Sequence, residues 1–231
     1  SLDIAIPLIV RKGTTEQLEK FVKPVIAGEK IAALGITEPG GGSDVANIKT
    51  TAERKGDHYI VNGSKTFITS GVRGDQLTTA VKTGEDNAQG ISMLIIESDT
   101  PGYSVSKKLK KTGWWASDTA QIYFDDCRVP VSNLIGEENM GFYYMMENFQ
   151  NERLQICVMA YMTAQIALEE SIKYVKERKA FGKTLNGFQV TRHKLVDMAT
   201  QVEVAREFTY RIAAKINSGE KLFLILDEIL K

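Results

Sequence analysis

The sequence is poor in the residues that build metal centres and disulfide scaffolds. Its 231 residues include two histidines, His58 and His193, and two cysteines, Cys127 and Cys157, with no C-x-x-C pair. Metal clusters and disulfide frameworks need several such residues at close spacing. We therefore expect no metal site and two free thiols in a reducing compartment.

The chain also lacks a net charge and a long apolar run. Lys plus Arg and Asp plus Glu each number 29, so no overall positive field attracts nucleic acid, and the basic stretch 107–111 is expected to be a solvated face. No segment of about 18 apolar residues is present to span a bilayer, and no apolar signal segment follows Ser1. A soluble protein with neither a nucleic-acid partner nor a membrane span is predicted.

Hydrophobic periodicity predicts helices at both ends of the chain. Residues 15–27 carry apolar side chains at helical spacing and end at Gly28. After Asn139 there is no proline, and apolar residues recur every three or four positions to Val175 and again from Val190 to Ile216. These stretches predict two long helices joined by a loop around residues 181–188.

The middle of the chain, from Ile31 to about Val129, has the pattern of a β domain. Asn62-Gly63 is typical of a two-residue hairpin turn. The runs with strand character are 59–61, 65–69, 76–82, 91–97 and 120–124. The predicted fold class is α+β, with a central antiparallel, barrel-like β domain flanked by helical segments.

Three consecutive glycines follow an apolar run and a proline in residues 36–44 (ITEPGGGSD). Such a backbone can approach a ligand closely and turn several N–H groups toward a pyrophosphate; a flexible surface turn is an equal alternative on these residues alone. The G-x-G-x-x-G dinucleotide pattern is absent because Val45 occupies its last position. Gly182-Lys183-Thr184 is not a P-loop, since Glu177 stands where the first glycine is required.

Glu152 interrupts an apolar stripe that helical spacing forms from Met145, Phe149, Ile156 and Met159 or Ala160. A carboxylate in such surroundings is partly desolvated, which raises its pKa and makes it a stronger base for a carbon proton. The alternative is a structural ion pair with Arg153 or a neighbouring helix. Spacing alone favours that alternative.

Three separated motifs carry a family resemblance. They are ITEPGGGSD at 36–44, NGSKTFITSG at 62–71 and ERKAFGK at 177–183 followed by Gln189. Together they resemble the acyl-CoA dehydrogenase family in order and spacing, over nearly the whole chain. The segments 136–144 and 151–154 are most similar to the long-chain branch.

The resemblance implies FAD as the cofactor and three domain segments: the end of an N-terminal helical domain (1–33), a central β domain (34–135) and the start of a C-terminal helical bundle (136–231). Many members carry tryptophan where this chain has Phe67. An arginine at position 178 can pair with the pyrophosphate of a neighbouring subunit's FAD. The cofactor-binding residues implied are Leu34, Gly35, Ile36, Thr37, Gly42, Ser43, Phe67, Ile68, Thr69, Arg178, Phe181 and Gln189.

The resemblance also reverses the interpretation of Glu152, because the long-chain and isovaleryl branches carry their catalytic base at this helical position. Glu152 is thus implied to remove the proton α to the thioester carbonyl while the β hydrogen leaves as hydride to flavin N5. The substrate-binding residues implied are Ser43, Ala88, Gln89, Tyr143, Phe149, Gln150, Asn151 and Arg153.

The implied reaction is α,β-dehydrogenation of an acyl-CoA in fatty-acid β-oxidation. Electron-transfer flavoprotein is the expected acceptor, a homodimer or homotetramer the expected assembly, and the bacterial cytoplasm or mitochondrial matrix the expected location. Family members usually exceed three hundred residues, so the chain is expected to be partial. The helices that remain are then expected to expose apolar faces. A truncated, non-catalytic flavin-binding or dimerisation module and an acyl-CoA oxidase are the alternatives.

Overall fold

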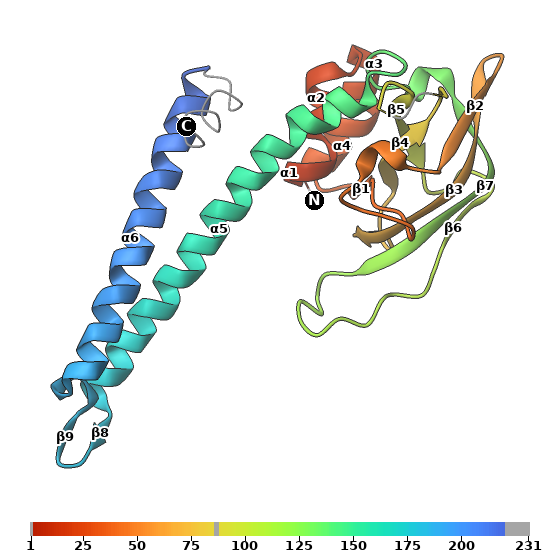
Figure 1. Cartoon of the computed structure of the whole chain (residues 1–231). Helices are drawn as coiled ribbons and strands as arrows, with labels where there is room; N and C mark the ends of the chain where they lie inside the picture. The colour runs from red at the N-terminus through yellow and green to blue at the C-terminus, as the bar shows by residue number, and fades with distance from the viewer. Residues whose placement is uncertain (1, 86–87, 220–231) are drawn as a thin grey trace. The chain divides into compact units, whose positions relative to one another are not determined.

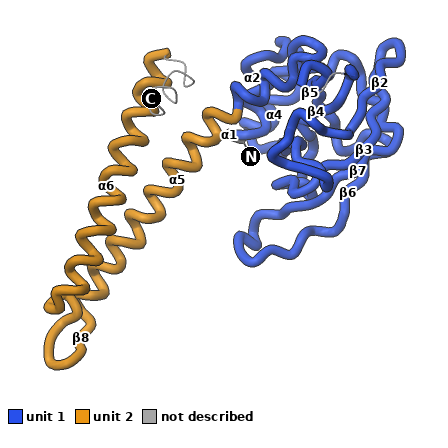
Figure 2. The backbone as a smooth tube through the Cα atoms, in the orientation of Figure 1, with its two compact units in different colours: residues 1–148 blue, residues 149–231 orange. Residues whose placement is uncertain are grey.

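The computed structural model describes residues 2–85 and 88–219 (Figure 1). The chain divides into two compact units, residues 1–148 and 149–231 (Figure 2). Unit 1 holds short N-terminal helices, a β-sheet and the first turns of a long helix. Unit 2 holds the rest of that helix and a second long helix. The division falls at residue 148, and the domain limits at 33 and 135 stay a prediction.

Short helical segments form the N-terminal part of unit 1. Thr14 begins the predicted helix with a capping box: its hydroxyl accepts from the Gln17 N–H at 3.2 Å, and the Gln17 side chain accepts from the Thr14 N–H at 3.1 Å. Gly28 follows the last turn with a φ of 77°, a left-handed conformation that ends helices. The predicted helix is thus confirmed. The segments are α1 (Leu2–Ala5), α2 (Pro7–Lys12), α3 (Thr15–Gln17), the π-helical turn η1 (Leu18–Val22) and α4 (Lys23–Ile26).

Seven strands of unit 1 form one curled sheet, as the barrel-like prediction expected (Figure 1). Its order is β1-β4-β2-β3-β7-β6, with β5 paired to β4. The purely antiparallel arrangement was wrong, because β1 pairs with β4 in parallel and β2 meets β4 in parallel at one residue pair. In the sequence, the β2–β3 hairpin lies between β1 and β4. The chain leaves the hairpin so that β4 runs in the same direction as β1 and pairs with it. The strands are β1 (Ala32–Gly35), β2 (Thr51–Lys55), β3 (His58–Thr69), β4 (Gln76–Lys82), β5 (Ile91–Glu97), β6 (Tyr103–Val105) and β7 (Thr119–Pro130).

The hairpin turn predicted at Asn62-Gly63 was wrong. Both residues lie inside β3, where the register against β7 shifts between Val61 and Gly63. The turn lies instead at residues 56–57, between β2 and β3, and Gly56 has a φ of 64°. A glycine within a strand can mark a bulge as well as a turn, and here a Cβ on Gly63 would lie 2.7 Å from the Thr50 Cα.

The core of unit 1 lies inside the curled sheet. Cys127 belongs to this core and Cys157 is exposed, and both are free thiols as predicted. The short 3-10 helix η2 (Val45–Asn47) lies between β1 and β2, and η3 (Val131–Asn133) follows β7 before the first long helix. Buried members of the core include Tyr59, Val61, Ile68, Leu77, Leu94, Ile96, Ile122, Phe124 and Val129.

The two long helices are confirmed as α5 (Gly141–Glu177) and α6 (Gln189–Asn217). The connection contains the small hairpin β8 (Lys179–Ala180) and β9 (Lys183–Thr184) and the 3-10 turn η4 (Leu185–Gly187). In unit 2 the helices pack through Tyr161 and Tyr210, whose ring centroids lie 6.2 Å apart. No helix within 2–85 or 88–219 is long and apolar enough to cross a membrane.

The expected exposure of apolar faces is found in unit 2. Phe208 is 51% exposed and Ile166 is 57% exposed on the two long helices. Such exposure is typical of an interaction surface. The other large apolar side chains exposed on these helices within unit 2 are Ile156, Val158, Met159, Met162, Tyr174, Val190, Val196, Met198, Val204 and Tyr210.

Candidate functional site

The glycine-rich segment leaves the end of β1 and forms a tight turn. Glu38 and Gly41 close it with two main-chain hydrogen bonds, N–H to carbonyl, of 3.0 and 3.1 Å. Residues 39–44 are exposed, and a Cβ on Gly40 or Gly41 would meet nothing within 4 Å. Gly35 and Ile36 are buried, so the main chain of the exposed turn is the part that a ligand can approach.

A second bulge in β3 places Phe67 in an unusual conformation. Between Lys65 and Ile68 the register against β7 shifts, and Phe67 has a φ of 58° with its side chain 68% exposed. A non-glycine residue in this region is strained, and such strain concentrates at ligand sites. Ile68 is buried in the core, so of the three predicted flavin neighbours here only Phe67 and Thr69 present side chains to solvent.

The structure brings these two predicted segments together. The N–H of Thr66 donates to the carbonyl of Thr37 at 2.7 Å. The Lys65 Nζ also donates to the carbonyl of Ile36 at 3.2 Å. The exposed turn and the Phe67 bulge are therefore held beside each other by residues of their own segments.

A buried ion pair lies under this junction. The Lys65 Nζ is 2.8 Å from the Glu38 Oε1, and the two side chains are 0% and 9% exposed. The Glu38 carboxylate also accepts the N–H groups of Lys49 at 2.6 Å and Thr50 at 2.9 Å. Burial lowers the pKa of Lys65 to about 8, although the Glu38 charge opposes the shift. Burial raises the pKa of Glu38, but the Lys65 charge and the hydrogen bonds outweigh it and the net pKa is lowered.

The chain after β3 is anchored by Asp118. This buried carboxylate accepts the N–H of Val72 at 2.7 Å and the Nε of Arg73 at 2.6 Å. The main-chain carbonyl of Asp118 accepts the N–H of Ser70 at 3.0 Å. Burial raises the pKa of Asp118, yet the hydrogen bonds and the Arg73 charge leave it below its usual range. These contacts fix the end of β3 that carries Thr69.

The predicted CoA-contacting residues Ala88 and Gln89 lie in the loop between β4 and β5, next to residues 86–87, which are not described. The loop is connected to the segment before α5, because the Thr83 hydroxyl donates to the Asn139 Oδ1 at 2.7 Å. The start of α5 carries Tyr143, which is 49% exposed. Three predicted substrate-binding residues therefore lie on neighbouring segments of unit 1.

Glu152 lies on α5 within unit 2 and is half-buried. The apolar stripe around it is present, but Met145 is 1% exposed while Ile156 and Met159 are 59% and 49% exposed. The predicted desolvation therefore does not come from the stripe within this chain. Phe149 and Gln150 are half-buried, and Asn151 and Arg153 are exposed.

The tip of the α5–α6 hairpin carries the three residues predicted to reach a neighbouring subunit. Phe181 has a φ of 51° and is 95% exposed, and its ring meets that of Phe188 edge-on with 6.4 Å between centroids. Arg178 and Gln189 are also exposed. The hairpin thus presents an aromatic ring and a guanidinium to solvent.

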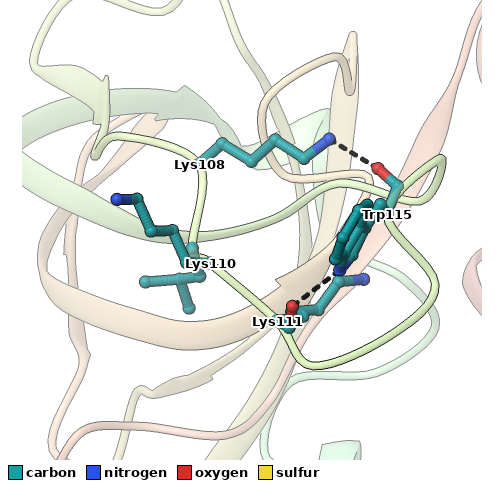
Figure 3. Close-up of a pocket in the computed structure, with 5 residues that line it drawn as sticks. Lys108, Lys110, Lys111 and Trp115 are labelled. Atoms are coloured by element: carbon teal, nitrogen blue, oxygen red, sulfur yellow. Dashed lines mark hydrogen bonds between the residues drawn. The ribbon is translucent and has the colours of Figure 1, made fainter.

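Residues 108–111 of the basic stretch line a hollow of about 380 Å³ with Trp115 (Figure 3). The Lys108 Nζ donates to the Trp115 carbonyl and the Trp115 Nε1 to the Lys111 carbonyl, both at 2.8 Å (Figure 3). Lys107, Lys108 and Lys110 are exposed, as expected of a solvated face. None of the predicted site residues lines this hollow. Among the described residues no group of side chains is arranged to hold a metal ion.

Comparison with known proteins decides the family. Residues 33–127 match the model of the acyl-CoA dehydrogenase middle domain, and residues 139–226 match that of the acyl-CoA dehydrogenase C-terminal domain. The chain belongs to the acyl-CoA dehydrogenase family.

Relatives of known sequence and structure agree with this membership. The mitochondrial long-chain specific acyl-CoA dehydrogenase of Mus musculus is 43% identical over 209 residues, which are 89% of this chain and 49% of that protein. The crystal structure of a probable acyl-CoA dehydrogenase from Mycobacterium abscessus is 50% identical with a TM-score of 0.93, covering 95% of this chain and 58% of the other. The FAD complex of PigA is 30% identical with a TM-score of 0.91, covering 95% and 57%. The chain spans about half the length of the curated relatives it matches.

Two residues of the candidate site were missed by sequence reasoning. Glu38 and Lys65 lie inside the recognised motifs but were assigned no role. Alternation along β3 gave a signal, because Lys65 shares the phase of the buried Tyr59 and Val61. A lysine at an inward position of a strand needs a buried partner.

Proposed function

We propose that this chain is the flavin-binding and base-carrying part of an FAD-dependent acyl-CoA dehydrogenase, which oxidises the Cα–Cβ bond of an acyl-CoA in fatty-acid β-oxidation. The observation that carries the proposal is the junction of the glycine-rich turn with the Phe67 bulge through the Thr66–Thr37 hydrogen bond. Family membership supports the same reaction class.

The residues of the junction fit a flavin nucleotide. The main-chain N–H groups of Gly40 and Gly42 in the exposed turn carry no bulky side chains and suit a pyrophosphate. The exposed ring of Phe67 suits a flat aromatic partner and keeps water from it. The main chain of 34–37 would lie along the cofactor, with Ser43 shared between cofactor and CoA. Arg178, Phe181 and Gln189 would reach the FAD of a second subunit in a homodimer or homotetramer.

Glu152 is the proposed base. Its carboxylate would take the proton α to the thioester carbonyl, leaving the electron pair on the α carbon to form the new double bond. FAD, when bound, supplies the acceptor for the hydride that leaves the β carbon. Tyr143 and Phe149 would lie along the acyl chain, and Gln150, Asn151 and Arg153 would adjoin the thioester. Ala88 and Gln89 would contact the CoA portion.

A long-chain thioester is the proposed substrate, electron-transfer flavoprotein the proposed acceptor, and the bacterial cytoplasm or mitochondrial matrix the proposed location. The long-chain mouse relative supports the first of these, and relatives occur in mitochondria and in bacteria.

An anaerobic absorbance spectrum of the chain with FAD, before and after a long-chain acyl-CoA, tests the proposal. Bleaching of the flavin band is expected. Glu152→Gln should abolish bleaching while FAD stays bound, because the amide cannot accept the α proton, and Glu147→Gln on the same helix is the matched control. Normal bleaching by Glu152→Gln would remove Glu152 as the base; bound but unbleached FAD in the unaltered chain would favour a non-catalytic module. Oxygen consumption would indicate an oxidase.

A further inference from the structure

A buried network of charged groups connects the glycine-rich turn to strand β3. Lys65 bonds both the Glu38 carboxylate and the Ile36 carbonyl, while Glu38 receives the N–H groups of Lys49 and Thr50. The chain before the turn, the chain after it and strand β3 therefore meet at one pair of side chains.

A buried ion pair contributes little net free energy to folding, because the loss of hydration offsets the attraction of the charges. Two charges taken out of water lose their hydration, and a well-packed apolar pair of similar volume is often as stable or more so. What such a pair adds is geometry, because the carboxylate accepts three donors from directions fixed by the backbone. The pair lies beside the contact between the glycine-rich turn and the Phe67 bulge. We therefore infer that the pair fixes the position of the turn relative to the bulge.

We propose that the buried Lys65–Glu38 ion pair is a positioning device that holds the glycine-rich turn against the β3 bulge in the conformation that binds the flavin. The inference rests on the proposed flavin site and deepens it. Neither side chain is a catalytic residue. Among the residues described, the charge that shifts the pKa of Lys65 is that of Glu38, and the charge that shifts the pKa of Glu38 is that of Lys65.

Lys65→Met and Glu38→Gln test the device in the full chain, first without flavin. Hydrogen exchange should become faster at the N–H groups of Thr50 and Thr66, and remain unchanged at Leu94 in the core. Lys20→Met is the matched control, because its ion pair with Glu97 has the same 2.8 Å separation but its side chain is 54% exposed. Unchanged exchange at Thr50 and Thr66 in both variants would overturn the inference whether or not the chain binds flavin.

FAD affinity is measured next, by flavin fluorescence. Lys65→Met and Glu38→Gln should weaken FAD about tenfold or more, and Lys20→Met should not. In the unaltered chain the affinity should fall above pH 8, where Lys65 loses its charge, and in Lys65→Met it should be independent of pH in that range. Faster exchange with unchanged affinity would overturn the inference. If the unaltered chain binds no FAD, the proposed function fails. The exchange experiment alone then decides whether the ion pair holds the turn against β3.

A double variant distinguishes two roles of the ion pair: positioning the turn, and only neutralising two buried charges. Lys65→Met combined with Glu38→Gln leaves no buried unpaired charge, so its melting temperature should recover relative to either single variant. Its FAD affinity should stay low, because the ammonium that joined the turn to β3 is gone. Recovery of both properties would show that the pair has no positioning role.

Discussion

Phe67 keeps a φ of 58° although its side chain is 68% exposed. Glycine adopts this conformation without strain, whereas phenylalanine does not. Because the ring is exposed, burial of the ring does not compensate for this strain. Phe67→Gly should raise the free energy of unfolding by about 1 kcal/mol relative to Phe67→Ala. Chemical denaturation measures the difference. Both variants should bind FAD more weakly, since both lack the ring; unchanged affinity in both would remove Phe67 from the site.

Lys65 makes the stability of the chain depend on pH in an unusual direction. Its pKa is about 8 in the folded chain against 10.5 for a free lysine side chain, so the unfolded chain holds more protons between these values. The contribution of Lys65 to the free energy of unfolding should therefore rise by about 1.5 kcal/mol from pH 8 to pH 9.5. Urea titrations of the unaltered chain and of Lys65→Met give this contribution as their difference. A difference that falls with pH would contradict the assigned shift.

At the scale of the strand, Gly63 allows β3 to bulge past Thr50. Its φ is 143°, and a Cβ would lie 2.7 Å from both the Thr50 Cα and the Thr50 Oγ1. Gly63→Ala should therefore lower the free energy of unfolding by about 2 kcal/mol or more, since strain and overlap add. Gly40→Ala is the matched control, because its Cβ would meet nothing within 4 Å. Equal denaturation midpoints for the two variants would contradict this account.

The elements differ in how far the sequence determined them. The long helices α5 and α6 were predictable because apolar periodicity extends over many turns. Asn62-Gly63 misled because the same dipeptide suits a turn and a bulge, and only the pairing with β7 decides. The parallel β1–β4 pairing joins residues about forty positions apart, which local pattern cannot reveal. In the candidate site, the motifs predicted roles for Thr37 and Phe67, whereas the Lys65–Glu38 contact depends on tertiary packing.

At the scale of the whole molecule, the α5–α6 pair exposes many large apolar side chains, a pattern typical of an interaction surface. We expect the chain to self-associate, with a sedimentation coefficient that rises with protein concentration. Ile166→Lys combined with Val204→Lys should reduce this association with little loss of stability, because these side chains are 57% and 64% exposed. A chain that stays monomeric at all concentrations would contradict the prediction.

The parallel pairing of β1 with β4 also sets the order in which the sheet beside the glycine-rich turn can form during synthesis. The glycine-rich turn leaves the ribosome directly after β1, while the β4 residues that pair with β1, such as Gln76 with Ala32, follow 44 positions later. At roughly 5–20 residues per second, β1 waits about 2–9 seconds for its partner. The strand that leads into the glycine-rich turn is therefore made before β2 and β3, yet it gains its own partner strand only after both of them have been made.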